Sequence, residues 1–293
     1  MNVAPALTHP DKVLFTGQGI TKRELSSYYA LVAERMLPHV KDRPLTLVRC
    51  PNGSEKPCFF QKHPGRGTPA AIRAVTVPEK HGSAPYGVIA DEDGLSALVQ
   101  YGALEIHTWG SRVADLEHPD ILVLDLDPDP TVPYELVVEA ARDVRDWLKR
   151  AGLESFPKTT GGKGFHVCVP LAPEHGWDEV RAFARHAAED IAEQAPERYV
   201  ATASKSVRRG KIFLDYLRNG RGATYVAPYS TRAKPGAPVS MPLHWDQVSP
   251  DIRPETFTLR TVVERLGAPS EDPFAEFETL AQRIPPGFAS KRE

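Results

Sequence analysis

The segment at residues 121–127, Ile-Leu-Val-Leu-Asp-Leu-Asp, restricts the fold more than any other part of the chain. It is a continuous apolar run that ends in acids, which is typical of a central strand covered on both faces. Residues 133–151 follow it with an apolar stripe at helical spacing, with Pro133 at the first turn and Gly152 at the end. A buried strand followed by an amphipathic helix predicts an α/β protein.

The rest of the chain alternates irregularly between expected strands and helices. Further helices are expected at residues 21–40, 95–101, 178–195 and 259–266. The first of them has Thr21 as a candidate N-cap and Glu24 three residues later, which together are typical of a capping box. Strands are expected at residues 45–49, 58–63, 73–77, 86–90, 104–107, 165–169 and 212–216. This pattern predicts a mixed α+β protein with two packed mixed β-sheets flanked by helices.

Composition narrows the classes of function. The formal net charge of the 293 residues is −2, so a nucleic-acid partner would be held by local basic patches and not by a global field. The N-terminus has no signal-peptide pattern, and no apolar run approaches the ~20 residues of a membrane span. We therefore expect a soluble cytoplasmic protein with no membrane partner. Cys50, Cys58 and Cys168 have no metal-ligand spacing, and we expect three reduced thiols.

Asp125 and Asp127 are the first candidates for chemistry. Side chains two residues apart on a strand share a face and lie ~6.6 Å apart along it, so the two carboxylates project together. They repel one another unless a cation lies between them, and Mg²⁺ or Mn²⁺ suits oxygen ligands of this kind. Asp-Pro-Asp-Pro-Thr at 127–131 is rich in turn formers, so a simple turn is the competing interpretation.

Asp215 favours the metal interpretation, because it ends a second apolar strand in a segment that is otherwise free of acids. The basic residues of that segment are Lys205, Arg208, Arg209, Lys211, Arg218, Arg221 and Arg232. A solvated surface normally mixes charges of both signs, whereas this run surrounds a carboxylate. The pattern indicates binding of a triphosphate or of a nucleic-acid backbone.

The loop Thr159-Thr160-Gly161-Gly162-Lys163-Gly164 runs into the strand Phe165-His166-Val167. Glycines let backbone amides approach an anion, and the hydroxyls and Lys163 add donors and positive charge. The spacing is not that of a Walker A loop, and a tight hairpin turn explains the loop equally well. His166 faces away from the core beside this loop if Phe165 and Val167 face into it.

Taken in order, Asp125-Leu126-Asp127, then Thr160-Gly161-Gly162-Lys163-Gly164-Phe165-His166, then Asp215 resemble the three motifs of the archaeo-eukaryotic primase superfamily. More narrowly, the chain resembles the polymerase domain of bacterial ligase D, an end-joining repair enzyme, and its stand-alone relatives. Further matching segments are His9-Pro10-Asp11-Lys12, Arg49-Cys50-Pro51-Asn52-Gly53, Phe59-Phe60, Leu104-Glu105-Ile106-His107 and Ala227-Pro228-Tyr229-Ser230. The resemblance therefore covers nearly the whole chain.

The resemblance implies one primase-polymerase domain over residues 1–293. Within it, an N-terminal α/β part is expected at 1–100, a catalytic core with an RRM-like sheet at 101–284, and a tail or linker at 285–293. The implied activity is template-directed addition of (ribo)nucleotides to a primer 3′-hydroxyl, in gap filling and end-joining repair, with two Mn²⁺ or Mg²⁺ ions. The implied partners are nucleoside triphosphates, DNA with a 5′-phosphate at a gap or break, Ku, and ligase and nuclease modules, at the bacterial nucleoid.

Carried over by position, the resemblance assigns catalysis and metal binding to Asp125, Asp127 and Asp215. Nucleotide contacts are implied for Thr160, Gly161, Lys163, His166, His107, Lys205, Arg208, Arg218 and Arg232. DNA contacts are implied for Lys12 and Lys22 at the 5′-phosphate and for Phe59 and Phe60 on the template side. Since neighbours on a strand alternate faces, one of the two phenylalanines is also expected in the core. The chain departs from the family at His9, where asparagine is common, and at Val48, where some relatives have a basic residue.

Two other functions compete with the polymerase hypothesis. Asp127-Pro128-Asp129-Pro130-Thr131 fits the Asp-x-Asp-x-Thr pattern of haloacid-dehalogenase-type phosphohydrolases, whose nucleophile is an aspartate. That family also needs a downstream pair of aspartates, and no such cluster follows a later apolar strand. A catalytically silent nucleic-acid-binding module is the other alternative. Such a module gains nothing from three carboxylates beside a glycine loop, which favours the enzyme.

Overall fold

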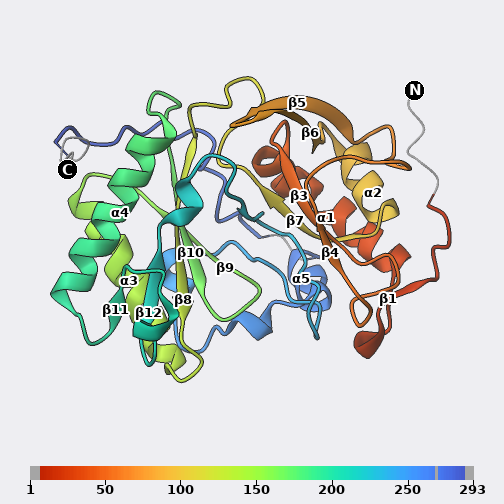
Figure 1. Cartoon of the computed structure of the whole chain (residues 1–293). Helices are drawn as coiled ribbons and strands as arrows, with labels where there is room; N and C mark the ends of the chain where they lie inside the picture. Colours follow the sequence, from red (N-terminus) through yellow and green to blue (C-terminus); the bar gives the residue numbers. More distant parts are fainter. Residues whose placement is uncertain (1–6, 268–269, 288–293) are drawn as a thin grey trace. The chain divides into compact units, whose positions relative to one another are not determined.

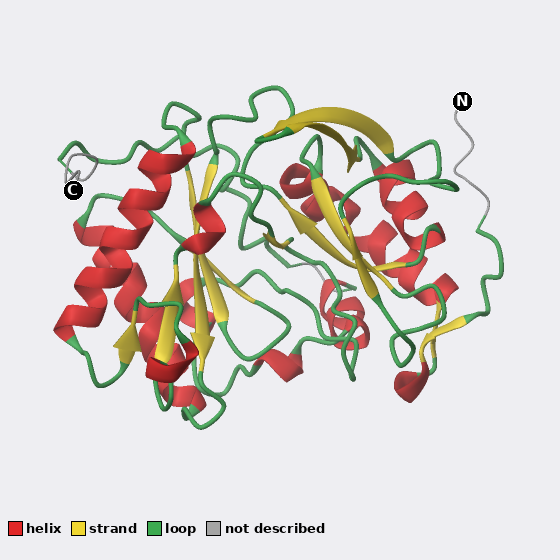
Figure 2. Ribbon diagram, in the orientation of Figure 1, coloured by secondary structure: helices red, strands yellow, loops and turns green. Residues whose placement is uncertain are grey.

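The computed structural model describes residues 7–267 and 270–287, and the chain divides into two compact units. Unit 1 consists of residues 1–114, 224–240 and 255–271, and unit 2 of residues 115–223, 241–254 and 272–293. Each unit contains a β-sheet and helices (Figures 1 and 2), so the predicted α+β class is confirmed. The expected division at residue 100 stays a prediction, and most of the expected tail, residues 288–293, lies outside the described residues.

Unit 2 is built on a five-stranded mixed sheet with the strand order β11-β12-β8-β10-β9. Its strands are β8 (Ile121–Pro128), β9 (Phe156–Thr159), β10 (Phe165–Pro170), β11 (Tyr199–Val200) and β12 (Ile212–Asp215). Its helices are α3 (Tyr134–Arg150), α4 (Trp177–Gln194) and the 3-10 turns η2 (Lys205–Val207), η3 (Leu217–Asn219) and η4 (Trp245–Gln247). The apolar segment at 121–127 is the central strand of this sheet, as predicted.

The alternation of side chains on β8 gives the sheet of unit 2 two different faces. Leu122, Leu124 and Leu126 are at most 1% exposed. Both α3 and α4 pack against β8 and lie on one side of the sheet in Figure 1. Asp125 and Asp127 project from the opposite face, because they alternate with the leucines. The leucine face thus forms the core, and the aspartate face is left for chemistry.

Unit 1 contains a six-stranded sheet in which every pairing of named strands is antiparallel. Its strands are β3 (Leu45–Arg49), β4 (Phe59–Gln61), β5 (Arg73–Glu79), β6 (Gly82–Val88), β7 (Ala103–Thr108) and β13 (Tyr225–Val226), beside the two-stranded ribbon of β1 (Val13–Phe15) and β2 (Ile20–Thr21). Its helices are α1 (Lys22–Val40), α2 (Glu92–Gln100) and α5 (Leu259–Leu266), with the 3-10 turns η1 (Thr16–Gln18) and η5 (Pro254–Thr256) nearby. Thr21 and Glu24 form the predicted capping box of α1.

The sheet of unit 1 also has two unlike faces. Leu47 pairs with Ile106, and both are buried in the core to which α1 and α2 contribute. The two helices lie side by side in Figure 1. The intervening positions form the other face, where Thr46 pairs with His107 and Val48 with Glu105. This second face carries polar side chains on strands that are apolar on their reverse.

Two sequence-based expectations about unit 1 were wrong. Phe59 and Phe60 are both exposed, at 46% and 73%, because β4 is three residues long and pairs only with β3, at the margin of the sheet. Neither phenylalanine therefore enters the core. Cys50 and Cys58 form a disulfide with their Cα atoms 4.4 Å apart, because the pairing of Arg49 with Phe59 brings the adjacent residues together. Only Cys168 agrees with the expectation, as a buried free thiol.

Among the residues that the structure describes, no helix is both long enough and apolar enough to cross a membrane.

Candidate active site

Cross-strand pairing places four polar side chains in one row on the sheet of unit 2. Asp125 on β8 lies opposite Asp215 on β12 and opposite His166 on β10, and His166 in turn lies opposite Lys158 on β9. Directly paired residues share a face and have Cβ atoms about 4.5–5.5 Å apart. Asp127 projects from the same face and is paired with Phe213. Three carboxylates and one imidazole, from three strands, thus meet on the face opposite the helices.

Asp125 and His166 form a buried pair with His166 Nε2 3.4 Å from Asp125 Oδ1. Burial lowers the pKa of His166 to about 4, and the nearby Lys158 adds to this effect, so the imidazole is neutral at neutral pH. Burial works against ionisation of Asp125, but His166 and Arg218 outweigh it and bring the pKa of Asp125 to about 2. Asp125 is therefore a charged acceptor, and His166 faces it with a neutral ring.

The other two carboxyl groups are shifted in the opposite direction. Burial raises the pKa of Asp127, and the charge of Asp125 raises it further. Burial also raises the pKa of Asp215, although Arg218 partly offsets it. Crowded carboxylates disfavour one another's ionised form, and a cation bound among them removes that penalty. The set therefore has the electrostatic signature of a cation site.

Two arginines of the basic segment lie on these carboxylates. Arg218 Nε is 3.1 Å from Asp125 Oδ2 and 3.4 Å from Asp215 Oδ2. Arg208 donates to Asp127 Oδ2 at 3.3 Å, and its guanidinium lies 3.7 Å from the centre of the Phe213 ring. Part of the predicted basic environment of Asp215 is thus present. Lys205 begins η2, but its side chain lies outside the described part of the structure.

The donor chemistry of this site fits a divalent metal ion. Its oxygen ligands are of the kind that Mg²⁺ and Mn²⁺ prefer, and Arg218 already places a positive charge between Asp125 and Asp215. In the described residues, no group of three or more His, Cys, Asp or Glu side chains is arranged to hold an ion as it stands. A metal ion bound by Asp125 and Asp215 would therefore take over the position of the Arg218 guanidinium.

The glycine loop is a hairpin that joins β9 to β10 directly beside this row. Thr160 donates from its backbone N–H and its hydroxyl to Gly164 O, both at 3.2 Å, and its Oγ1 accepts from Gly162 N at 3.2 Å. Gly161 has a φ of 61°, which favours glycine. Lys163 is exposed at the tip. The loop is thus a hairpin turn and can still bind an anion, because it carries the exposed Lys163 beside the strand that holds His166.

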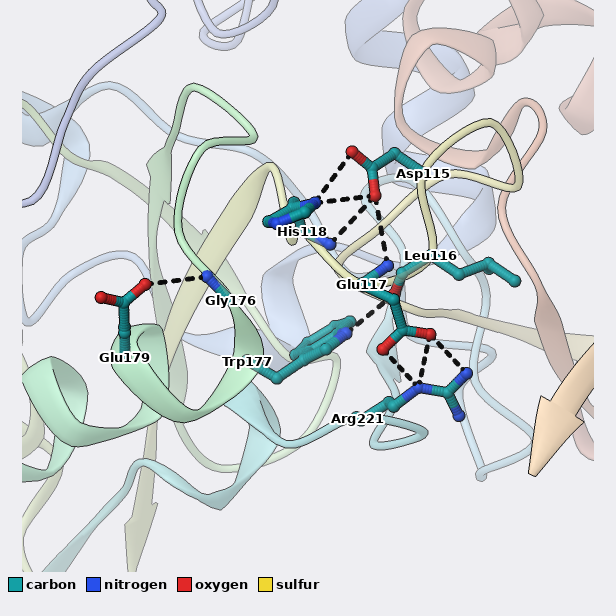
Figure 3. A network of polar contacts seen from close by, with 8 residues as sticks. All are labelled: Asp115, Leu116, Glu117, His118, Gly176, Trp177, Glu179 and Arg221. Atoms are coloured by element: carbon teal, nitrogen blue, oxygen red, sulfur yellow. Dashed lines mark hydrogen bonds and ion pairs between the residues drawn. The ribbon is translucent and has the colours of Figure 1, made fainter. Parts of the chain in front are cut away.

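Arg221 has a different role from its basic neighbours (Figure 3). Its Nε and terminal nitrogen donate to both oxygens of Glu117, with three contacts of 2.7–3.0 Å. Trp177, at the start of α4, donates from its ring nitrogen to Leu116 O at 2.8 Å. The loop after η3 is therefore anchored to residues 115–118, which are in turn anchored to α4. This network fixes the chain that follows Arg218.

The pKa of His166 predicts how stability depends on pH. In the folded protein His166 stays neutral down to about pH 4, whereas an unfolded chain takes up that proton near 6.5. The unfolded state thus binds more protons between these values, so the free energy of unfolding falls as the pH falls from 6.5 to 4, by about 3 kcal/mol from this group. Urea denaturation of the metal-free protein at several pH values measures this. His166→Gln is expected to flatten the slope, and an unchanged slope would contradict the assignment.

The polar face of unit 1 holds the other two predicted nucleotide contacts. Glu105 Oε2 accepts from His107 Nε2 at 2.9 Å and from Arg232 Nε at 2.9 Å. Phe60, which lies on β4, contacts the His107 ring edge-on, and the centres of the two rings are 6.4 Å apart. His107 and Arg232 are therefore held in one cluster, although 125 residues separate them in sequence.

Lys12 and Lys22 line a cavity of about 530 Å³ within unit 1. Lys22 Nζ donates to Thr8 O at 2.8 Å and to Gln100 Oε1 at 2.7 Å, while Lys12 Nζ donates to Pro51 O at 2.5 Å. Burial lowers the pKa of Lys22, and the charge of Lys12 lowers it further. Arg49 and Arg66 also line the cavity, and none of the described residues that line it is an Asp or a Glu. Such a cavity is suited to an anion such as a phosphate.

Several side chains of these sites were not predicted. Glu105 shares a strand face with His107, and that spacing of two was a signal that could have revealed it. Lys158 is fully buried, and sequence patterns place lysine outside, so no signal indicated it. The guanidinium of Arg49 lies 3.4 Å from the centre of the Tyr101 ring. This contact could not be predicted, because it joins two segments that are distant in the sequence.

Comparison with known proteins identifies the family. A family model described as the LigD primase-polymerase domain matches residues 21–274. The chain belongs to this family. LigD primase-polymerase domains are metal-dependent nucleotidyltransferases of DNA repair, and the chain is a nucleotidyltransferase of this kind. The haloacid-dehalogenase alternative is thereby excluded, and Asp129 instead accepts from the backbone N–H and hydroxyl of Thr131 in a local turn.

Individual relatives agree with this assignment. The multifunctional non-homologous end joining protein LigD of Pseudomonas aeruginosa is 39% identical over 279 residues, which are 95% of this chain and 33% of that protein. The bifunctional LigD of Bacillus subtilis is 32% identical over 260 residues, 88% of this chain and 42% of that protein. The solved polymerase domain of Mycobacterium tuberculosis ligase D in complex with DNA has a TM-score of 0.88 and 34% identity, covering 94% of this chain and 99% of that one. The chain thus spans about a third of the Pseudomonas aeruginosa relative.

Proposed function

We propose that the chain is a template-directed polymerase that adds nucleotides to a primer 3′-hydroxyl at gaps and breaks in DNA. The observation that carries this proposal is the row of Asp215, Asp125 and His166 across β12, β8 and β10, with Asp127 on the same face. Carboxylates on neighbouring strands are what phosphoryl-transfer sites use to bind divalent ions. The DNA in the related Mycobacterium tuberculosis complex supports the same class of substrate.

The chemistry would combine metal ions with side chains of this chain. Two Mg²⁺ or Mn²⁺ ions held by Asp125, Asp127 and Asp215 would supply Lewis-acid activation and neutralise the triphosphate. Asp125 keeps its charge for this purpose, because the neutral His166 and the cationic Arg218 stabilise the carboxylate. In this reaction the primer 3′-hydroxyl would lose its proton to solvent, its oxygen would form a bond to the α-phosphorus of the incoming nucleotide, and the bond from that phosphorus to the pyrophosphate would break.

The remaining predicted residues would bind the substrates. In unit 2 we assign the triphosphate to Thr160, Gly161 and Lys163 of the hairpin and to Lys205, Arg208 and Arg218. In unit 1 we assign nucleotide contacts to His107 and Arg232, the template side to Phe59 and Phe60, and the 5′-phosphate of the DNA to the cavity of Lys12 and Lys22. The exposure of both phenylalanines supports a role in base stacking.

The biological setting is a proposal as well. The relatives named for non-homologous end joining support a role in that repair pathway, together with Ku and with ligase and nuclease modules. We place this activity at the bacterial nucleoid in the cytoplasm. Manganese and ribonucleotides are the conditions in which we expect the highest activity.

A gap-filling assay tests the proposal and its DNA contacts together. The protein is incubated with a gapped duplex, a ribo- or deoxyribonucleoside triphosphate and Mn²⁺ or Mg²⁺, and extension of the primer is measured. We expect template-dependent extension that is faster on a 5′-phosphorylated gap than on a 5′-hydroxyl gap. Removing two phosphate contacts in Lys12→Ala/Lys22→Ala should cost at least about tenfold on the phosphorylated substrate only.

The control is Lys80→Ala, which removes an exposed lysine of the turn between β5 and β6. This variant should keep the preference for the 5′-phosphate. Absence of extension by the wild-type protein under all these conditions would refute the polymerase proposal. Equal losses on the phosphorylated and the hydroxyl substrate would refute only the assignment of the cavity.

A further inference from the structure

Glu105 is a buried carboxylate on the polar face of the unit 1 sheet. It is 5% exposed and lies on β7 between Leu104 and Ile106, whose side chains point into the core on the other face. Its cross-strand neighbour is Val48, which in turn pairs with Phe60. An isolated buried charge is expensive, so a carboxylate at this position needs donors around it.

Three donors from two segments of the chain converge on this carboxylate. His107 Nε2 and Arg232 Nε are both 2.9 Å from Oε2, and the backbone N–H of Ala233 is 2.9 Å from Oε1. Burial raises the pKa of Glu105, but the three donors outweigh it and bring the pKa to about 2. The carboxylate is therefore ionised and can only accept, which requires His107 to carry a proton on Nε2.

This arrangement determines orientation more than stability. A buried ion pair roughly offsets its own desolvation and is often replaced by apolar residues at no loss, so stability alone does not explain Glu105. What the carboxylate does is fix the ring plane and tautomer of His107 and the direction of the Arg232 fork. Because the His107 ring contacts Phe60 edge-on, a fixed His107 ring also restricts the position of this exposed aromatic side chain on β4.

We propose that Glu105 is a positioning residue that holds His107 and Arg232 in the orientation in which they contact the incoming nucleotide. This inference rests on the proposed function, which assigns nucleotide contacts to His107 and Arg232. Glu105 itself does not touch the substrate. It acts through His107 and Arg232, so removing its carboxylate should weaken the nucleotide contacts that these two residues make.

Steady-state primer extension with a complementary ribonucleoside triphosphate and Mn²⁺ tests this role. Glu105→Gln keeps the size of the side chain, removes the charge and turns one acceptor into a donor that faces Arg232, His107 or Ala233. We expect its KM for the nucleotide to rise by about tenfold and its kcat to change by less than threefold, as when a binding interaction is lost and the reaction step is kept. Glu105→Asp retains the charge and should recover part of the loss.

The controls separate positioning from damage to the fold. Glu79→Gln removes a carboxylate that accepts from the Tyr86 hydroxyl elsewhere on the same sheet, and its KM should equal that of the wild type. Thermal melts followed by circular dichroism set a temperature at which every variant is folded. The ¹⁵N resonances of the His107 ring, recorded without substrate, should show the Nε2–H tautomer in the wild-type protein and lose it in Glu105→Gln.

The results distinguish failure of this inference from failure of the proposed function. If His107→Ala and Arg232→Ala leave the KM unchanged, the nucleotide contacts assigned to them are wrong and the role of Glu105 fails with them. If these two variants raise the KM but Glu105→Gln does not, the inference alone is overturned. In a protein that carries both alanines, Glu105→Gln should add less than twofold, and a full additional tenfold would also overturn it.

Discussion

Replacing Asp125, Asp127 or Asp215 by alanine is expected to lower the rate of nucleotide addition by about 10³-fold or more, since each ligand supports several kcal/mol of metal-assisted stabilisation. The three carboxylates come from two paired strands and share one face, so loss of any one leaves an incomplete site. Single-turnover extension of a gapped duplex with Mn²⁺ measures the effect. Mn²⁺ binding followed by electron paramagnetic resonance should weaken in parallel.

Asp129→Ala is the matched control for these variants. Asp129 follows the same strand, but its carboxylate accepts from the backbone N–H and the hydroxyl of Thr131 within a local turn. This variant should retain activity within about threefold, because a surface turn contributes little. The Asp215 variant should be no less stable than the wild type, because burial raises the pKa of this carboxyl group and therefore opposes its ionisation in the folded protein. Full activity of Asp125→Ala would contradict the whole assignment.

Of the glycine-to-alanine substitutions in unit 2, we expect Gly164→Ala to destabilise the folded protein most. A Cβ at this position would lie 1.8 Å from Leu126 O and 3.0 Å from Leu126 C, both backbone atoms of β8. No side-chain rotation can relieve such a clash, so β10 must move away from β8. We expect a loss of about 3 kcal/mol or more in the free energy of unfolding, at the upper end of the cost of overpacking.

The same substitution should abolish catalysis, because His166 and Asp125 are paired across the two strands that separate. Urea denaturation and the extension assay measure the two effects. Gly220→Ala is the control: its Cβ would meet only Leu217 O, at 3.6 Å, and its backbone is extended. A Gly164→Ala protein of normal stability would show that β8 and β10 tolerate a wider separation than the structure indicates.

Sequence patterns predicted the parts of this site that depend on neighbouring residues. The apolar run at 121–127 identified β8, its period of two placed Asp125 and Asp127 together, and the capping residues Thr21 and Glu24 located the start of α1. These features are local, because they follow from the geometry of one strand or one helix turn. The assignment of Asp215 and His166 to strands was local in the same way.

The register between strands could not be predicted. That His166 lies opposite Asp125, and Lys158 opposite His166, depends on which strands pair, and many pairings fit the same apolar pattern. The same limit explains the disulfide, since Cys50 and Cys58 meet only because β3 and β4 pair. It also explains Phe59 and Phe60, because alternation buries one of two neighbouring residues only where one face of their strand is covered, and neither of these side chains is buried on β4.

Each unit is formed from three separate stretches of the sequence, and this limits how the protein can be divided into fragments. Unit 1 takes its last strand, β13, from residues 224–240 and its last helix, α5, from 255–271, both of which come after most of unit 2 in the gene. A fragment ending at Ala114 would lack β13, whose Val226 pairs with His107 on β7, and would also lack Arg232. Neither unit can therefore be expressed from one uninterrupted stretch of coding sequence, and a protease cut near residue 114 would not release a self-sufficient half.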